Sequence, residues 1–289
     1  MSQKGLFSIA SLAKTAPFIA LVALAAGGWE CQRGGAARAA EVTTAPSPAA
    51  EMIVAGLGGF RGIAAEVVWF RADRLQDEGR YAELAQLAAW LTFLEPHTPE
   101  VWAFTAWNLA YNVSVMMPTF ADRWRWVQAG LKLLRDDGLH LNPGDPVIHK
   151  ELAWMFLLKV GGPLDQACSY YRDQWKAIVE ECEKNGELEK IGLVKERMDA
   201  VDAEYGAQNW KHPYACALYW AVCGMESARK PQHRAELRQV IYQTLMMETR
   251  LDNRFAARAL KEMRTAYAEN PSKLLLQIMV KFKETHGLE

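Results

Sequence analysis

Two stretches of the sequence follow one pattern: LEPHTPEV at residues 94–101 and LNPGDPVI at residues 141–148. Each has a leucine, then two prolines three positions apart, then an aliphatic residue two positions after the second proline. The dipeptide Ala106-Trp107 falls on Ala153-Trp154 at the same offset. Similarity at a fixed offset is typical of repeat architectures, in which one supersecondary unit recurs along the chain. The pattern therefore predicts a repeated helical unit.

Signals for the ends of helices recur along the chain from Met52 on, where no convincing strand pattern occurs. Thr98-Pro99 and Asp145-Pro146 each combine an N-cap residue with a proline in the first turn. Thr119 and Asp122 form a capping box, and Gly138 and Asn185-Gly186 are expected to end helices. These signals predict an all-α body of about ten helices joined by short turns.

Residues 65–98 resemble one tetratricopeptide repeat, a helix-turn-helix unit of about 34 residues. The matching positions are the turn residues Gly79 and Tyr81, the inner-face residues Leu84, Ala88 and Leu91, the closing Pro96, and in the next unit Trp102, Ala106 and Pro143. The resemblance implies an α-solenoid of stacked hairpins. The repeats are degenerate, because the second unit is about 13 residues too long and the third has a widened turn at Gly161-Gly162.

A second resemblance begins before the repeats. The glycine-rich stretch at residues 58–62, followed by residues 69–73, is similar to the opening of uncharacterised repeat proteins that are anchored by their N-termini in bacterial envelopes. This similarity extends over about residues 52–225 and implies no reaction. We expect degenerate repeats in residues 52–186 and a cap of C-terminal helical hairpins in residues 187–289.

The N-terminus predicts membrane targeting. Residues 15–29 are uncharged and follow Lys4 and Lys14, and as a helix they would rise only about 22 Å, less than a bilayer core of about 30 Å. That length is typical of a signal-peptide core, but a spanning segment over residues 6–29 is also open. We expect residues 1–32 to be a retained anchor in the cytoplasmic membrane with the body outside the cytoplasm, and residues 33–51 a flexible linker.

Two alternatives to a retained anchor stay open. One is a removed signal that leaves a periplasmic protein, and the other is a buried or interfacial helix of a cytosolic protein. The five cysteines do not decide the compartment. Small buried hydrophobic side chains are the ordinary role for them, and disulfides between helices stay open for Cys168, Cys182, Cys216 and Cys223.

Composition excludes several classes of protein. Of 289 residues, 51% are hydrophobic and 23% charged, which excludes a largely disordered chain and a polytopic membrane protein. The net charge of -1 argues against nucleic acid as a partner. The sequence has no HExxH, CxxC, G-x-S-x-G or phosphate-loop motif. We therefore expect no metal, no cofactor and no catalytic residue.

The candidate binding residues come from the repeat resemblance. In tetratricopeptide proteins the first helix of each unit lines the concave surface, which implies a partner-binding groove formed by Trp69, Asp73, Gln76, Trp107, Asn108, Tyr111, Lys150 and Trp154. The carboxylate-clamp pattern of chaperone-binding relatives is not matched. Asn108 and Asn112 lie one turn apart in an apolar segment, so their amides must bond to the backbone, to each other or to a ligand.

Two functions follow from these features. The first is a non-catalytic scaffold tethered at the bacterial cell envelope, which binds a helix or extended segment of a protein partner, in an envelope complex, on its concave face. The alternative is a helical protein or enzyme that binds a small ligand, a peptide or a sugar, in a Trp-rich pocket. A closed cavity at Trp107, Asn108 and Asn112 would favour the alternative, and an open groove would favour the scaffold.

Overall fold

The computed structural model describes residues 56, 58–163 and 165–288, which form helices and turns and contain no strand. The predicted anchor and linker, residues 1–51, lie outside the described residues. Among the described residues no helix combines the length and apolar character that a membrane span requires. The chain divides into two compact units, Met1–Arg61 and Gly62–Glu289.

The prediction of an all-α body is confirmed for the described residues. Prolines, cap residues and positive-φ glycines separate the helices. The elements, in chain order, are the 3₁₀ helix η2 (Gly58–Phe60), α3 (Arg61–Asp77), α4 (Tyr81–Leu94), α5 (Pro99–Trp107), the π-helix η3 (Asn108–Val113), the 3₁₀ helix η4 (Ser114–Met116), α6 (Phe120–Lys132), the π-helix η5 (Leu133–Gly138), α7 (Leu139–Leu141), α8 (Pro146–Trp154), the π-helix η6 (Met155–Val160), α9 (Cys168–Asn185), the 3₁₀ helix η7 (Leu188–Ile191), α10 (Lys195–Tyr205), α11 (Pro213–Ser227), α12 (Pro231–Thr249), the 3₁₀ helix η8 (Asn253–Phe255), α13 (Ala256–Glu269) and α14 (Lys273–His286).

Most of the predicted helix ends are observed. The Thr119 hydroxyl accepts a hydrogen bond from the backbone N–H of Asp122, and the Asp145 carboxylate caps α8. Gly186, with φ of 69°, ends α9 in the left-handed conformation. The prediction that Gly138 ends a helix is wrong, because the chain continues through it from η5 into α7.

The backbone of Gly138 gives the physical reason why the helix continues. Its φ of -59° and ψ of -52° are right-handed helical values. A Cβ atom on Gly138 would lie 3.4 Å from Cδ1 of Ile148 and 3.5 Å from Cβ of Trp102, which are ordinary van der Waals distances. Gly138 therefore does not adopt the left-handed conformation that ends a helix.

The sequence repeat has a counterpart in the local structure. Both α5 and α8 have nine residues, begin with a proline and end with the tryptophan of the Ala-Trp dipeptide. Each then continues into a π-helix of six residues, η3 and η6. Such i→i+5 turns are rare in proteins. The two segments are therefore equivalent in backbone geometry as well as in sequence pattern.

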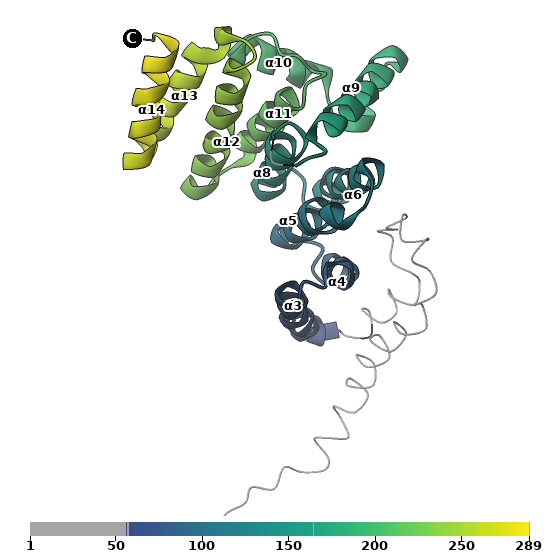
Figure 1. Cartoon of the computed structure of the whole chain (residues 1–289). Helices are drawn as coiled ribbons and strands as arrows, with labels where there is room; N and C mark the ends of the chain where they lie inside the picture. The colour runs from purple at the N-terminus through teal and green to yellow at the C-terminus, as the bar shows by residue number, and fades with distance from the viewer. Residues whose placement is uncertain (1–55, 57, 164, 289) are drawn as a thin grey trace, which may run out of the picture. The chain divides into compact units, whose positions relative to one another are not determined.

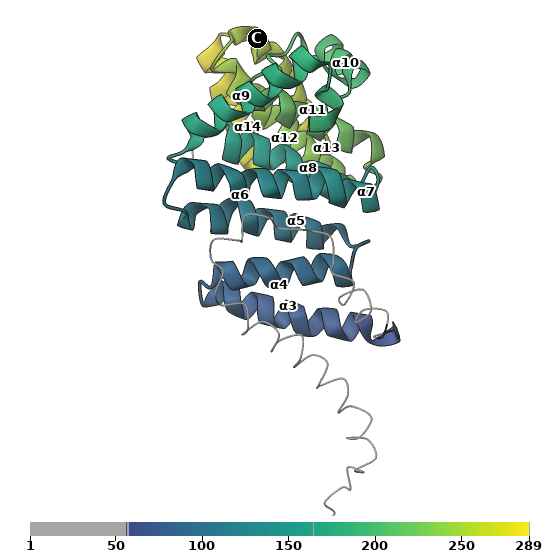
Figure 2. The same cartoon turned by 90° about the vertical axis from the view of Figure 1, so that its right-hand side faces the viewer.

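Helices that are close in the sequence pack against one another. In the unit Gly62–Glu289, α5 contacts α4, α6 and α8, and α11 contacts α8 and α12. Helix α12 in turn contacts α13, which contacts α14 (Figure 1). Figure 2 shows α3, α4, α5 and α6 as a stack of roughly parallel helices in chain order. The amide of Asn142 donates to the carbonyl of Pro96 at 2.8 Å, so the two loops that open the repeated segments also lie side by side.

One hydrophobic core extends through most of this unit, from Ala85 on α4 to Phe282 on α14. A smaller cluster joins α3 to α4 and α5. The small residues Ala72, Ala106 and Ala153 are fully buried where helices approach. The large core continues across residue 186, where the boundary between repeats and cap was expected. The four described cysteines, Cys168, Cys182, Cys216 and Cys223, are free thiols.

Candidate functional site

The three predicted binding residues of α3 have different environments. The Trp69 ring is half-buried and its centroid lies 4.9 Å from that of Phe104 on α5. Asp73 is exposed, and Gln76 is half-buried beside the turn that follows α3. Trp69 therefore packs between helices, and Asp73 is the one of the three that is open to solvent.

Trp107 and Tyr111 lie together where α5 becomes η3. Their rings are stacked with centroids 5.8 Å apart, and Trp107 is 38% exposed. The ammonium group of Lys159, from η6, lies 5.3 Å from the centroid of the Tyr111 ring, a cation–π distance. Burial, followed by the nearby carboxylate of Glu151, raises the pKa of Tyr111 well above its usual range, so the phenol stays protonated.

The two asparagines of η3 bond to each other. The amide of Asn112 donates to Oδ1 of Asn108 at 2.9 Å, the second of the partners expected for them. Asn108 is completely buried, and its Nδ2 group has no hydrogen-bond partner among the described residues. The pair therefore leaves one amide hydrogen-bond donor unsatisfied inside the protein.

Lys150 and Trp154 on α8 complete the predicted set. The Lys150 ammonium forms an ion pair of 2.7 Å with Glu236 on α12. Trp154 is half-buried and packs against the core. The residues predicted for one groove thus lie in three groups, on α3, on α5–η3 and on α8, and the ion pair of Lys150 extends the last group toward α12.

Sequence reasoning missed a buried ionic cluster next to η3. Lys159 is 3% exposed, and its ammonium lies 2.5 Å from Oδ2 of Asp165. Asp165 also accepts hydrogen bonds from the Tyr171 hydroxyl and the Ala167 backbone N–H, and Arg123 lies 3.5 Å away. The available signal was one lysine inside the apolar run at residues 155–160, because a buried cation requires a partner.

The electrostatics of this cluster favour the charged form of Asp165, whereas burial lowers the pKa of Lys159 despite its hydrogen bond to Asp165. Burial disfavours ionisation of Asp165, but the hydrogen bond from Lys159, that from the Ala167 N–H and the Lys159 charge outweigh it. The pKa of Asp165 is therefore lowered. The pair connects η6 to the turn before α9, which makes it a structural tie. Among the described residues no group of three or more His, Cys, Asp and Glu side chains could hold a metal ion.

Glu151 on α8 is a second titratable group that the sequence analysis did not select. It is half-buried, and burial raises its pKa to about 7, partly offset by the positive charge of Lys150. Its negative charge also acts on Tyr111. A fraction of Glu151 is therefore protonated near neutral pH, on the helix that also carries Lys150 and Trp154.

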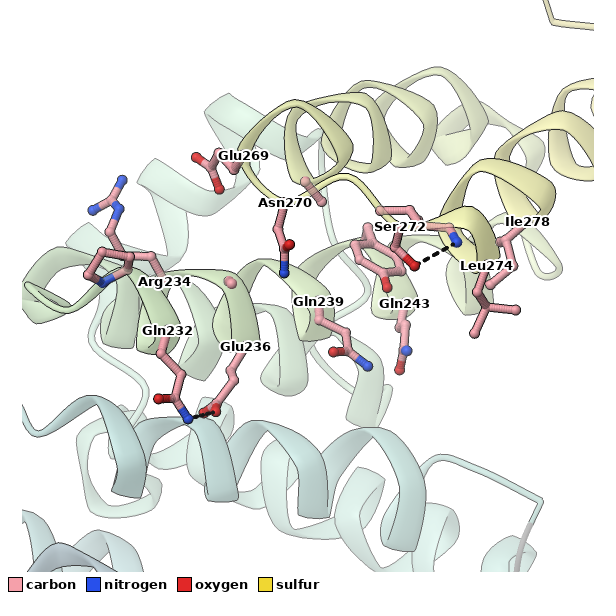
Figure 3. A pocket seen from close by; sticks show the side chains of 15 residues that line it. Gln232, Arg234, Glu236, Gln239, Gln243, Glu269, Asn270, Ser272, Leu274 and Ile278 are labelled. Carbon is pink, nitrogen blue, oxygen red and sulfur yellow. Dashed lines mark hydrogen bonds between the residues drawn. The ribbon is translucent and has the colours of Figure 1, made fainter.

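A groove that is open to a ligand runs along α12. Four polar side chains project from one side of this helix at helical spacing and line a groove of about 880 Å³ (Figure 3). Because residues three and four apart share a helix face, they form a continuous polar stripe. The stripe consists of Gln232, Glu236, Gln239 and Gln243.

The opposite wall of the groove comes from the end of α13 and the start of α14. It offers Asn270 and Ser272 as polar groups and Leu274 and Ile278 as apolar ones, with Leu274 66% exposed. Figure 3 shows the amide of Asn270 directed toward α12. The groove thus combines amides, which donate and accept hydrogen bonds, with exposed aliphatic surface.

The predicted Trp-rich pocket does not coincide with this groove. Trp107, Asn108 and Asn112 line neither the groove nor two smaller cavities, one among α6, α9 and α11 and one among α10, α11 and α12. No protein-family model matches the sequence, and neither a curated protein nor a solved structure is found to be similar to it. The function of the protein is therefore inferred from the surfaces of this chain itself.

Proposed function

We propose that the protein is a non-catalytic scaffold that binds an extended segment of a partner protein along α8 and α12. The single observation that carries this proposal is the stripe of Gln232, Glu236, Gln239 and Gln243 beside a long open groove. Eleven positions of an α-helix rise about 16 Å, the length of roughly five extended residues. A row of three amides and one carboxylate at this spacing suits the backbone groups of such a segment.

The predicted binding residues on α8 adjoin this stripe. Lys150 reaches Glu236 at 2.7 Å, so the face of α8 with Lys150 and Trp154 continues into the stripe of α12. A partner segment longer than five residues would pass from the groove toward Trp154 and then toward Trp107 and Tyr111 on α5–η3. The exposed Trp107 ring and the half-buried Tyr111 and Trp154 rings would bind apolar side chains of the partner.

The proposal includes the architecture that would create this surface. We propose that the hairpins stack as an α-solenoid of degenerate tetratricopeptide-like units, with the first helix of each unit on the concave side. Consecutive packing of α4, α5, α8, α11 and α12 supports it, as does the repeated combination of a nine-residue α-helix and a six-residue π-helix. An N-terminal membrane anchor would hold this body at the envelope, where its partners would be.

A displayed library of random peptides tests the binding surface. Full-length protein is the target, and enriched peptides are measured on wild type and on the double variant Gln239→Ala/Gln243→Ala. We expect the double variant to bind at least about tenfold more weakly, because both side chains would bond the peptide backbone. Gln277→Ala is the matched control, since Gln277 is exposed on α14 and is not among the residues that line the groove.

Two results would count against the proposal. One is a library that yields no enriched sequence after repeated selection. The other is a set of enriched peptides that bind the double variant and wild type equally well, because such peptides would occupy another surface.

A further inference from the structure

A second cavity, separate from the α12 groove, lies among α6, η5, α8–η6, α9, η7 and α11 and has a volume of about 240 Å³. Its residues come from segments far apart in the sequence. It is lined by Trp124, Gln128, Leu131, Lys132, Arg135, Leu152, Phe156, Trp175, Ile178, Lys190, Ile191 and Trp220.

The aromatic wall of this cavity is held in place by neighbouring rings. Trp124 stacks on Tyr171 with centroids 5.7 Å apart. Phe156 and Trp175 meet edge to face at 4.7 Å. Rings fixed in this way keep their orientation whether or not a ligand is present, so the cavity is largely preformed.

A glycine allows the third tryptophan to form part of the wall. A Cβ atom at Gly192 would lie 2.8 Å from Cζ2 of Trp220 and 2.8 Å from Cδ of Arg135. A larger residue would push both side chains away, and the φ of 79° at this position also favours glycine. The backbone at Gly192 thus sets the positions of an aromatic ring and a cation that line the same cavity.

The charges that line the cavity are all positive. Lys132, Arg135 and Lys190 contribute three cations, and no carboxylate is among the lining residues. Arg135 is paired with Asp136 and Lys190 with Glu187, whose side chains do not line it. Lys132 is exposed and forms no ion pair within the described part of the chain. With Arg135 and Lys190 each paired, Lys132 supplies the excess positive charge that favours an anionic group at this position.

We infer that this cavity binds a small aromatic carboxylate, with the ring against Trp124, Trp175 and Trp220 and the carboxylate near Lys132 and Arg135. The volume of the cavity limits the size of the ligand, because an apolar cavity of about 150 Å³ holds benzene and drug-sized ligands need about 300 Å³ or more. One ring with a short acidic chain fits between these limits. A cationic ligand of the same shape would be repelled by the unpaired charge of Lys132, and a neutral one would lose the electrostatic attraction.

Titration calorimetry with three ligands of one shape tests the inference on the full-length protein. The probes are 3-phenylpropionate, 3-phenyl-1-propanol and 3-phenylpropylamine, which are anionic, neutral and cationic. We expect saturable binding of the carboxylate, at least about tenfold weaker binding of the alcohol, and weaker binding of the carboxylate as salt increases. Equal affinity for all three ligands, or no saturable binding of the carboxylate, would overturn the inference.

Variants locate the binding site. Lys132→Gln/Arg135→Gln should raise the Kd of 3-phenylpropionate at least about tenfold and leave that of the alcohol within about twofold. Arg125→Gln is the control, because Arg125 is exposed on the same helix and is not among the lining residues. If circular dichroism shows that the double variant does not fold, Lys132→Gln alone should raise the Kd at least about threefold, because Lys132 is exposed. An unchanged Kd in the folded variant would place the ligand elsewhere and refute the site.

Discussion

The segments α5–η3 and α8–η6 have the same lengths and the same change from α- to π-helix, but their buried polar groups differ. In η3 the fifth residue is Asn112, which donates a hydrogen bond to Asn108. In η6 the fifth residue is Lys159, which forms an ion pair with Asp165. One backbone geometry thus accommodates a neutral amide pair in the first segment and a pair of charges in the second.

The turns downstream of the two segments explain this difference. The turn after η6 is the widened one predicted at Gly161-Gly162, and it carries Asp165 within reach of Lys159. After η3 the chain passes through η4 to α6, whose Thr119 and Asp122 cap that helix. The widened turn, which departs from the repeat pattern, therefore supplies Asp165 as the counterion of Lys159. The shared α- and π-helical segment supplies the common backbone geometry.

The largest effect is expected from loss of the buried cation. Lys159→Met should lower the free energy of unfolding by about 3–5 kcal/mol, because Asp165 would stay buried without its main partner. Urea denaturation monitored by circular dichroism measures this change. The double variant Lys159→Met/Asp165→Asn should recover part of the loss, since no uncompensated charge is left.

The ion pair between Lys159 and Asp165 also predicts how the stability of the protein changes at acid pH. Because the folded state lowers the pKa of Asp165, its contribution is complete above the unfolded value of about 4 and is lost as the pH falls through the lower, folded value. Wild type should therefore lose this stabilisation only in strong acid. A Lys159→Met cost below about 1 kcal/mol would show that the ion pair is not a structural tie.

A smaller effect is expected in the first segment. Asn112→Leu should cost about 1–3 kcal/mol, because Oδ1 of buried Asn108 would lose its donor. Removing both amides in Asn108→Leu/Asn112→Leu should cost less than the sum of the single changes, as measured in a double-mutant cycle. The proposed difference between the two segments would be wrong if Asn112→Leu lowered the free energy of unfolding more than Lys159→Met does.

The smallest change in stability is expected at Glu151 of α8, the position that corresponds to Phe104 of α5 in the sequence repeat. The pKa of Glu151 is raised to about 7, so the folded state binds a proton more tightly than the unfolded chain does. The resulting penalty is absent near pH 4, grows as the pH rises toward 7 and is constant above. Glu151→Gln should therefore stabilise the protein by about 1–2 kcal/mol at pH 9 and change little at pH 4.

Thermal unfolding at the two pH values checks this prediction. Glu262→Gln is a suitable control, because Glu262 is buried but paired with Arg238 at 2.8 Å, and its loss should destabilise the protein at pH 9. If Glu151→Gln has the same effect at both pH values, Glu151 ionises normally and α8 does not differ from α5 in this respect.

Local signals in the sequence were sufficient for much of the fold. The caps at Thr119 and Asp145 and the stop at Gly186 depend on neighbouring residues, and they were predicted correctly. Gly138 was misinterpreted because a glycine permits the left-handed conformation of a helix end but does not impose it, and here the backbone stays right-handed helical with φ of -59°. The residue type alone does not distinguish the two conformations.

The site residues were harder to predict because the site depends on contacts between segments that are distant in the sequence. The side of α12 that carries Gln239 and Gln243 is polar in the sequence, but polar faces are usually solvated. Its importance depends on the ion pair between Lys150 and Glu236 and on the position of α14, which no local pattern contains. Likewise, the three tryptophans at 124, 175 and 220 line one cavity only because α6, α9 and α11 converge.

The central proposal, a partner segment along α12, is tested most directly by photo-crosslinking in the native cell. A benzoylphenylalanine replaces Gln239 in the groove or, as a control, Lys184, which is exposed on α9. We predict that the probe at Gln239 forms one discrete adduct, in which mass spectrometry locates the crosslink in one short segment of one partner protein, and that the probe at Lys184 does not. The same adducts from both positions, or no adduct at Gln239, would contradict the proposal.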